Sequence, residues 1–140
     1  MKLSIFFALS ALSLAFAAQA LAAETNRMSE KATAAEDVAV SHTISTEELK
    51  QAIAQNEGFV IVDVRSPEEF ATGRVPGAIN IPLDSIEKRS AEIPKDKSVV
   101  LTCRSGRRSG LAQETLRQLG YTNIRNHIGG ILQWTGPIEK

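Results

Sequence analysis

The chain has 140 residues, enough for one ordinary domain and too few for two. Its 16 basic residues balance 16 acidic residues, so it lacks the basic excess that a nucleic-acid-binding surface requires. Only 5% of the residues are aromatic, and a packed core must therefore be built mainly from Val, Ile, Leu and Ala.

The first residues have the features of a secretory signal. Lys2 supplies a positive charge, residues 3–18 are apolar apart from three serines, and residues 18–22 place small side chains at A-x-A spacing. The apolar run is shorter than the ~20 residues of a transmembrane helix. We therefore expect residues 1–22 to be a signal peptide cleaved after Ala22, which leaves a periplasmic protein without stable membrane insertion. An uncleaved N-terminal anchor is the alternative.

Residues 23–40 are rich in Ala, Glu and Lys and have weak apolar periodicity, so we expect a loosely ordered lead-in there. The folded domain is expected at residues 41–140. Its first helix begins near Ser45, because Ser45 and Glu48 form a capping-box pattern, and it ends at residues 56–58.

The next elements alternate between strand and helix. Residues 59–64 are apolar except for one aspartate, which is typical of a strand buried on both faces of a parallel sheet. Ser66 opens a second helix, since Pro67 suits the first helical position and Glu69 completes a second capping box. Gly73 ends this helix.

The second half of the domain continues the alternation. We expect a short strand, a helical crossover, a buried strand, a helix and a last strand, in that order, at residues 77–82, 83–91, 98–102, 109–119 and within 121–127. Such alternation predicts a single α/β domain with a mainly parallel central sheet flanked by helices.

Cys103 is the only cysteine of the chain and directly follows the expected strand at residues 98–102. Exported proteins normally use cysteines in disulfide pairs. A lone cysteine is therefore buried and inert, bridged to another chain, or retained for its reactivity. Residues 104–108 form a polar loop at the carboxyl end of the strand, where α/β folds bind their ligands. This position favours a reactive cysteine.

The loop after Cys103 has the residue types that stabilise an anion. N–H groups at a helix start point towards an anion placed before it, and a curled loop adds further N–H groups. Arg104, Arg107 and Arg108 add positive charge, and Gly106 allows a backbone conformation that other residues resist. We therefore expect the pKa of Cys103 to lie below the ~8.5 of a free cysteine.

Four segments in the same order make the chain similar to the rhodanese family. They are Val62-Asp63-Val64-Arg65, Gly77-Ala78-Ile79-Asn80-Ile81-Pro82, Cys103-Arg104-Ser105-Gly106-Arg107-Arg108-Ser109 and Gly129-Gly130-x-x-x-Trp134. Within the family the chain most resembles the small exported bacterial thiosulfate sulfurtransferases, so residues 41–140 are expected to be one rhodanese-like domain. One departure is Arg74-Val75, where many relatives have His-Ile.

The resemblance implies a two-step sulfur transfer. Cys103 takes the outer sulfur of thiosulfate as a persulfide, sulfite leaves, and the persulfide passes its sulfur to a thiophilic acceptor such as cyanide or a thiol. The partners would then be a small anionic sulfur donor and that acceptor, with no nucleic acid. The residues expected to bind substrate are Arg104, Ser105, Gly106, Arg107, Arg108 and Ser109.

Other marked residues have structural interpretations. Asp63 and Arg65 are expected to hold neighbouring loops through hydrogen-bonded ion pairs and not to touch substrate. The paired glycines after the last strand are expected to permit a tight turn near the loop. No metal or other cofactor is expected, since His42 and His127 show no ligand spacing.

Two other functions stay open. A cysteine phosphatase uses a similar loop but needs Cys-x5-Arg, whereas here Arg108 gives Cys-x4-Arg and Ser109 occupies the position of the phosphatase arginine. A persulfide carrier or binding module serving one partner is the other alternative, and the sequence does not separate it from an independent enzyme. The physiological donor and acceptor and the oligomeric state are also left open.

Overall fold

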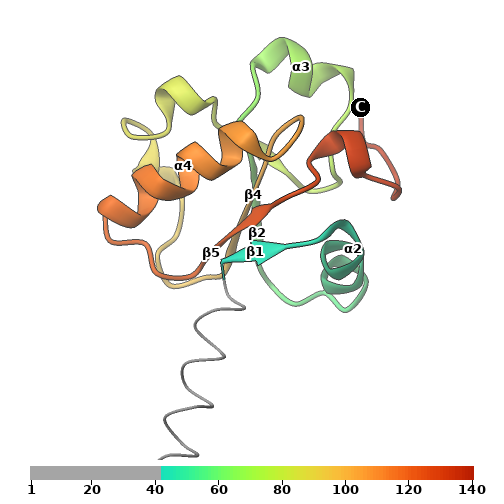
Figure 1. Cartoon of the computed structure of the whole chain (residues 1–140), viewed down its shortest axis with the longest axis horizontal. Coiled ribbons are helices and arrows are strands. Elements are labelled where there is room, and N and C mark those ends of the chain that lie inside the picture. Colours follow the sequence, from blue (N-terminus) through green and yellow to red (C-terminus); the bar gives the residue numbers. More distant parts are fainter. Residues whose placement is uncertain (1–41) are drawn as a thin grey trace, which may run out of the picture. The chain divides into compact units, whose positions relative to one another are not determined.

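The computed structural model describes residues 42–140 (Figure 1). The expected signal peptide at residues 1–22 and lead-in at residues 23–40 lie outside the described residues. Within residues 42–140, no helix is both long enough and apolar enough to cross a membrane.

A parallel sheet forms the centre of the described fold. Its five strands are β1 (Thr43–Ile44), β2 (Val60–Asp63), β3 (Ile79–Asn80), β4 (Val99–Thr102) and β5 (Ile124–His127). They are hydrogen-bonded in the order β1-β5-β4-β2-β3, and every pair is parallel. β4 and β2 have neighbours on both sides, as their apolar sequences predict. The expected α/β domain with a mainly parallel sheet flanked by helices is confirmed.

Helices and short 3-10 segments connect the strands. They are α2 (Thr46–Ala54), α3 (Pro67–Thr72), α4 (Arg107–Gln118), η1 (Leu83–Ser85), η2 (Ser90–Glu92) and η3 (Ile131–Gln133). Both expected capping boxes are present: Ser45 with Glu48 begins α2, and Ser66 with Glu69 begins α3. In each box the serine and the glutamate satisfy N–H groups that the first turn leaves unpaired.

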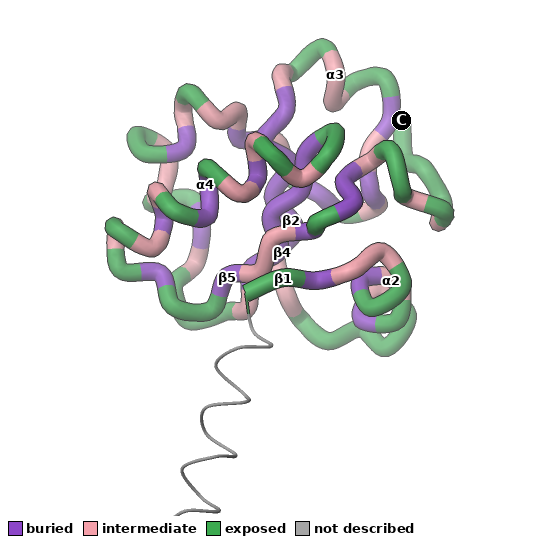
Figure 2. Tube along the Cα trace, viewed as in Figure 1, coloured by how far each residue is buried: buried purple, intermediate pink, exposed green. Residues whose placement is uncertain are grey.

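Side chains alternate between the two faces of the sheet and form two apolar clusters. On one face Val62 packs with Leu116 of α4, and Cys103 belongs to this cluster. On the other face Val100 packs with Leu49 of α2. Successive residues of a strand point to opposite faces, so each central strand contributes to both clusters. Figure 2 shows the buried positions concentrated along these strands.

The crossover expected to be helical at residues 83–91 is helical only in part. The segment contains the short 3-10 helices η1 and η2, joined by turns, and most of its hydrogen bonds are of the i→i+3 type. The Tyr121 hydroxyl lies within hydrogen-bond distance of the carbonyls of Ser90 and Ile93 and can donate its one hydrogen to either. This contact anchors the crossover to the chain before β5.

The start of one helix and the presence of one strand also differ from the sequence prediction. α4 begins at Arg107, two residues earlier than expected, because Gly106 adopts a positive φ of 92° and turns the chain directly into the helix. β1 was not predicted, since a strand of two residues is too short to show any periodicity. The earlier start of α4 brings its first N–H groups closer to Cys103.

Candidate active site

Cys103 lies at the carboxyl edge of the sheet, where β4 ends and the connection to α4 begins (Figure 1). Its side chain is a free thiol and is buried. The segment that runs from this cysteine into the first turn of α4, residues 103–109, is called the sulfur loop below. Its central position in the sheet means that the loops after β2 and β5 lie beside it.

The sulfur atom accepts hydrogen bonds from its own loop. The Gly106 N–H nitrogen lies 3.1 Å from Cys103 Sγ, and Ser109 Oγ lies 3.4 Å from it. Burial raises the pKa of Cys103. Hydrogen bonds from the Ser109 hydroxyl and from the N–H groups of Ser109, Ser105 and Gly106 together outweigh burial, so the pKa of Cys103 lies below its usual value. Neutral donors therefore favour the thiolate.

The segment after β5 explains why these N–H groups face the sulfur. The N–H groups of Ile131 and Leu132 donate to the carbonyls of Cys103 and Arg104, at 2.9 and 3.0 Å. A trans peptide places its N–H opposite its C=O. Because the Arg104 carbonyl is held on the side of η3, the Ser105 N–H is turned the other way, towards the sulfur. η3 thus braces the sulfur loop.

Two glycines allow the backbones to come this close. Gly130 has a positive φ of 57°, and a Cβ there would overlap the carbonyl oxygen of Arg104. Gly106 also has a positive φ, and its Cβ would lie 2.6 Å from the Ile128 carbonyl oxygen. A side chain at either position would push the sulfur loop and its brace apart. Gly129 and Gly130, the adjacent glycines after β5, therefore form a tight turn beside the sulfur loop, as expected.

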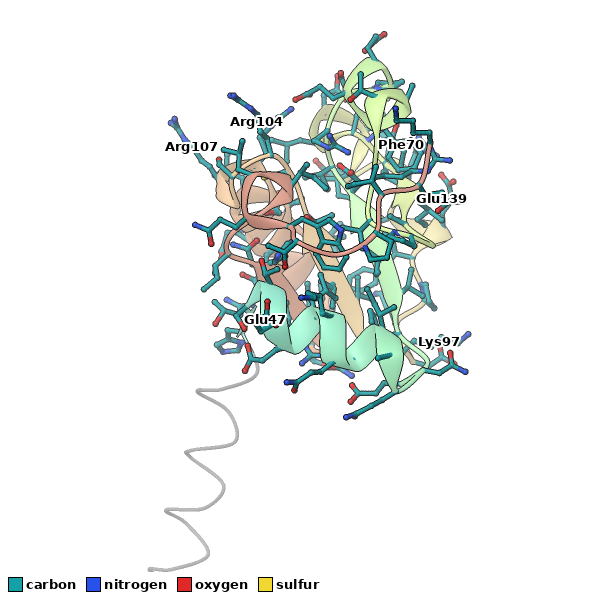
Figure 3. All side chains as sticks on the ribbon, turned by 90° about the vertical axis from the view of Figure 1, so that its right-hand side faces the viewer. Glu47, Phe70, Lys97, Arg104, Arg107 and Glu139 are labelled. Atoms are coloured by element: carbon teal, nitrogen blue, oxygen red, sulfur yellow. The ribbon has the colours of Figure 1, made fainter. Side chains whose placement is uncertain are left out.

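The three arginines of the loop are in different situations. Arg108 donates two hydrogen bonds of 2.7 and 2.8 Å to the Glu69 carboxylate of α3, and the hydrogen bond from Arg108 lowers the pKa of Glu69 to about 2. Arg104 and Arg107 are exposed and extend away from the ribbon in Figure 3. The charge of Arg108 is thus largely compensated, whereas the other two face solvent.

Asp63 and Arg65 form a buried ion pair at the carboxyl end of β2. An Arg65 guanidinium nitrogen lies 2.7 Å from Asp63 Oδ2, and the same nitrogen donates to the Gly73 carbonyl at the end of α3. Asn80 of β3 donates to the carbonyls of both Asp63 and Arg65. The pair therefore connects α3 and β3 to the central strand, and α3 in turn presents Glu69 to the sulfur loop.

Asn126 of β5 contacts the sulfur loop and was not predicted. Its Oδ1 accepts a hydrogen bond of 2.6 Å from the Ser109 hydroxyl, and its Nδ2 donates to the Gly106 carbonyl at 3.0 Å. The only signal in the sequence is a polar residue within the last strand. Nothing in that position indicated the loop as its partner, because the contact depends on the pairing of β5 with β4.

His127 is another residue whose surroundings were not predicted. Its ring nitrogens are hydrogen-bonded to Thr102 Oγ1 at 3.0 Å and to Thr46 Oγ1 at 2.9 Å. The side chain is buried, and burial lowers the pKa of His127. A neutral His127 therefore links β5 to β4 and α2. Among residues 42–140, no three potential ligands of the types His, Cys, Asp and Glu are grouped to hold a metal ion.

The chain is similar in sequence to known proteins. The rhodanese-like domain family matches residues 45–137. A sulfurtransferase of Allochromatium vinosum is 45% identical over 91 residues, which cover 65% of this chain and 85% of that protein. The thiosulfate sulfurtransferase PspE of Escherichia coli is 44% identical over 81 residues, which cover 56% of this chain and 77% of that protein.

A solved structure agrees with these matches. The crystal structure of a rhodanese-like domain protein from Staphylococcus aureus superimposes with a TM-score of 0.66 at 33% identity, over 70% of this chain and 96% of that chain. The parallel sheet, the cysteine after its central strand and the sequence matches lead to the same assignment. The chain belongs to the rhodanese family.

Proposed function

We propose that the protein is a sulfurtransferase that moves sulfur from thiosulfate, or a similar anionic donor, to cyanide or a thiol through a persulfide on Cys103. In the first step the Cys103 thiolate attacks the outer sulfur of thiosulfate, the S–S bond of thiosulfate breaks, and its electron pair leaves with sulfite. In the second step the acceptor attacks the outer sulfur of the persulfide and the Cys103 thiolate is restored.

The hydrogen-bonded environment of Cys103 Sγ is the observation that supports this proposal most. The chemistry needs a sulfur that is a nucleophile in the first step and a leaving group in the second. Donors fixed by the brace stabilise negative charge on Sγ at the end of the second step and lower the pKa of the resting thiol. The names of the relatives in Allochromatium vinosum and Escherichia coli support sulfur transfer, and the second supports thiosulfate.

Arg104 and Arg107 suit the attraction of an anionic donor. Both are exposed beside the sulfur loop, where they raise the positive potential without forming part of its hydrogen-bonded frame. Arg108 is less suited to this role, because Glu69 compensates its charge. We assign to Arg108 the task of holding the first turn of α4 against α3.

The proposal is tested by following the sulfur atom. Incubation of the protein with thiosulfate should add about 32 Da, one sulfur atom on a thiol. Cyanide should then remove this mass and release thiocyanate. Cys103→Ser should abolish both steps while leaving the fold intact, because a hydroxyl of nearly the same size is a far weaker nucleophile at neutral pH. Circular dichroism of the variant serves as the control.

Each contrary result has a clear meaning. If Cys103→Ser still forms thiocyanate from thiosulfate, Cys103 is not the sulfur carrier and the proposal is wrong. If the wild type takes up no sulfur but hydrolyses an aryl phosphate, the enzyme is a phosphatase despite its short loop. If only a persulfidated protein loads Cys103, the chain is a carrier that serves one partner and not an independent thiosulfate enzyme.

We also propose that the protein acts in the periplasm after loss of residues 1–22. The apolar run and the A-x-A spacing of the sequence support export. Intact mass measured on periplasmic extracts should show a first residue between Leu21 and Glu24, most often Ala23. Recovery of a form that retains Met1 in the membrane fraction would contradict cleavage.

A further inference from the structure

The Ser109 hydroxyl has two acceptors within reach and one hydrogen to give. Ser109 Oγ lies 2.6 Å from Asn126 Oδ1 and 3.4 Å from Cys103 Sγ. A hydroxyl carries a single hydrogen and two lone pairs. Ser109 can therefore donate to the amide oxygen or to the sulfur, but not to both with good geometry. The contact with the amide oxygen is at the short end of the range for an O–H···O hydrogen bond, whereas a neutral thiol sulfur is a weak acceptor, so the amide oxygen is the preferred acceptor while Cys103 is uncharged.

The orientation of the Asn126 amide is fixed by its other end. Asn126 Nδ2 donates to the Gly106 carbonyl at 3.0 Å. If the amide were reversed, its oxygen would face that carbonyl oxygen and neither group could donate. Oδ1 therefore faces Ser109 and can only accept. Gly110 leaves the space for this amide, since a Cβ there would lie 3.3 Å from Asn126 Nδ2.

The needs of the sulfur change with its charge. As a neutral thiol, Cys103 carries its own hydrogen and can donate it weakly to Ser109 Oγ. As a thiolate, the sulfur needs the Ser109 hydrogen, because a hydrogen bond to a charged acceptor is stronger than one to a neutral acceptor. In a persulfide the negative charge lies mainly on the outer sulfur, so Sγ is again a weak acceptor for the Ser109 hydroxyl.

We propose that Asn126 is a positioning residue: its Oδ1 accepts the hydrogen bond of the Ser109 hydroxyl until negative charge forms on Cys103 Sγ. The hydroxyl then rotates and donates to the sulfur. No covalent bond of Ser109 or Asn126 breaks in this exchange, and the hydroxyl only rotates. The hydroxyl donates to Asn126 Oδ1 again when the negative charge moves to the outer sulfur of the persulfide. This last step rests on the proposed function, whereas the exchange in the free enzyme does not.

The competition has a direction. Turning to the sulfur costs Ser109 its hydrogen bond to Asn126, so Asn126 opposes formation of the thiolate and Ser109 favours it. Removal of the amide should release the hydroxyl for the sulfur at all times. Removal of the hydroxyl should leave Asn126 without influence on the sulfur through this route.

The experiment is a double-mutant cycle on the ionisation of Cys103, measured by the far-ultraviolet absorption of the thiolate in the absence of any sulfur donor. The signal is specific, because the chain has one cysteine. Leu replaces Asn126 with a similar volume and no acceptor. Asn126→Leu should titrate at lower pH than the wild type, with roughly two- to tenfold more thiolate at a pH below the midpoint, the range of one neutral hydrogen bond.

The other two proteins of the cycle test the route. Ser109→Ala should titrate at higher pH than the wild type, and Asn126→Leu added to Ser109→Ala should cause no further change. The nearby charges of Arg108, which acts on the sulfur, and of its partner Glu69 are present in all four proteins and cancel from the comparison. A shift that persists in the Ser109→Ala background would show that Asn126 acts through Gly106, and the proposal would be overturned.

A second substitution keeps the proposal testable if Asn126→Leu does not fold. Asn126→Asp retains an acceptor towards Ser109 and should shift the titration to higher pH, by more in the wild-type background than in Ser109→Ala, where only the direct charge acts. Equal shifts in both backgrounds would overturn the proposal. Because no donor is added, failure of the sulfurtransferase assignment would leave these titrations unchanged.

Discussion

The carboxyl ends and the amino ends of the strands are packed differently. At the carboxyl edge the segments after β4 and β5 contact one another through their backbones, and Gly130 leaves no room for a side chain beside Arg104. At the opposite edge, before β2, Gly58 also has a positive φ, but a Cβ there would meet nothing described within 4 Å. The geometry around the sulfur is thus held by tight main-chain packing, whereas the backbone at Gly58 has open space around it.

Alanine at the two glycines should give the largest difference between the edges. Both substitutions strain a positive φ, which costs about 1 kcal/mol for an ordinary left-handed residue, and Gly130 has in addition a ψ of −165° that only glycine adopts readily. Gly130→Ala adds an overlap with the Arg104 carbonyl and should destabilise the fold by roughly 2–4 kcal/mol in total. It should also abolish most sulfur uptake, because the brace must move. Urea unfolding and mass measurement after thiosulfate give the two readouts.

Gly58→Ala is the matched control. It should lower stability only by its backbone strain and leave sulfur uptake at the wild-type rate. Equal losses of uptake in the two variants would show that conformational strain, and not the close approach of the brace, controls the sulfur loop.

Burial of His127 should make the stability of the fold depend on pH. Burial lowers the pKa of His127 from the ordinary 6.5, so the folded protein holds this ring neutral while the unfolded chain binds a proton more readily. The stabilising contribution is therefore complete above about pH 6.5 and is lost as the pH falls below it. Denaturation curves between neutral and mildly acidic pH should show this loss.

His127→Gln should remove much of that pH dependence, with a lower stability at neutral pH. His42→Gln serves as the control, since His42 is exposed before β1 at the opposite edge. If the slope of stability against pH is the same in wild type and His127→Gln, then His127 does not carry the effect.

The two capping boxes sharpen the comparison within the carboxyl side. Glu48 and Glu69 cap α2 and α3 in the same way, but only Glu69 also binds Arg108. Both variants weaken a capping box, and Glu69→Gln also loses the ion pair with Arg108. That pair is about one-third exposed and partly screened, so Glu69→Gln should destabilise the fold by about 1 kcal/mol and Glu48→Gln by about half as much. Thermal unfolding measures both variants, and a larger loss in Glu48→Gln would contradict this ranking.

The low pKa of Glu69 predicts a further difference at acid pH. The contribution of the Glu69 carboxylate is present above its ordinary value of 4.5 and is lost as the pH falls towards about 2. The Glu69→Gln variant should therefore lose less stability than the wild type over this range.

The exposed arginines should give the smallest effect. Arg104→Ala and Arg107→Ala should each raise the KM for thiosulfate by roughly two- to fivefold at low ionic strength, because each removes one solvent-screened charge beside the sulfur loop. Added salt should reduce the difference from the wild type. An increase in KM that is independent of salt would indicate direct contact with the donor and not long-range attraction.

Features that depend on neighbouring residues were predictable from the sequence. The capping boxes need three residues of context, and the buried strands show as apolar runs. Asp63 and Arg65 lie two positions apart where such a run ends, and an ion-paired role near the neighbouring loops was expected for both from that position. The lone Cys103 after a strand indicated the sulfur loop for the same reason.

Contacts set by the order of the strands were not predictable. Glu69 lies 39 residues from Arg108, and Asn126 lies 17 residues from Ser109. Their meeting depends on β5 lying beside β4 and on the position of α3, which no local pattern encodes. The crossover after β3 likewise contacts the distant Tyr121 hydroxyl, which no local pattern encodes.

The brace by η3 has an evolutionary consequence. It holds the sulfur loop through carbonyls and N–H groups, which every amino acid except proline supplies, so the side chains at positions 104 and 105 are not needed to keep the N–H groups aimed at the sulfur. Mutations there can accumulate without loss of the reactive cysteine. Descendants of this chain could therefore exchange one sulfur donor for another by changing the exposed rim of the loop, while inheriting the same cradle for the thiolate.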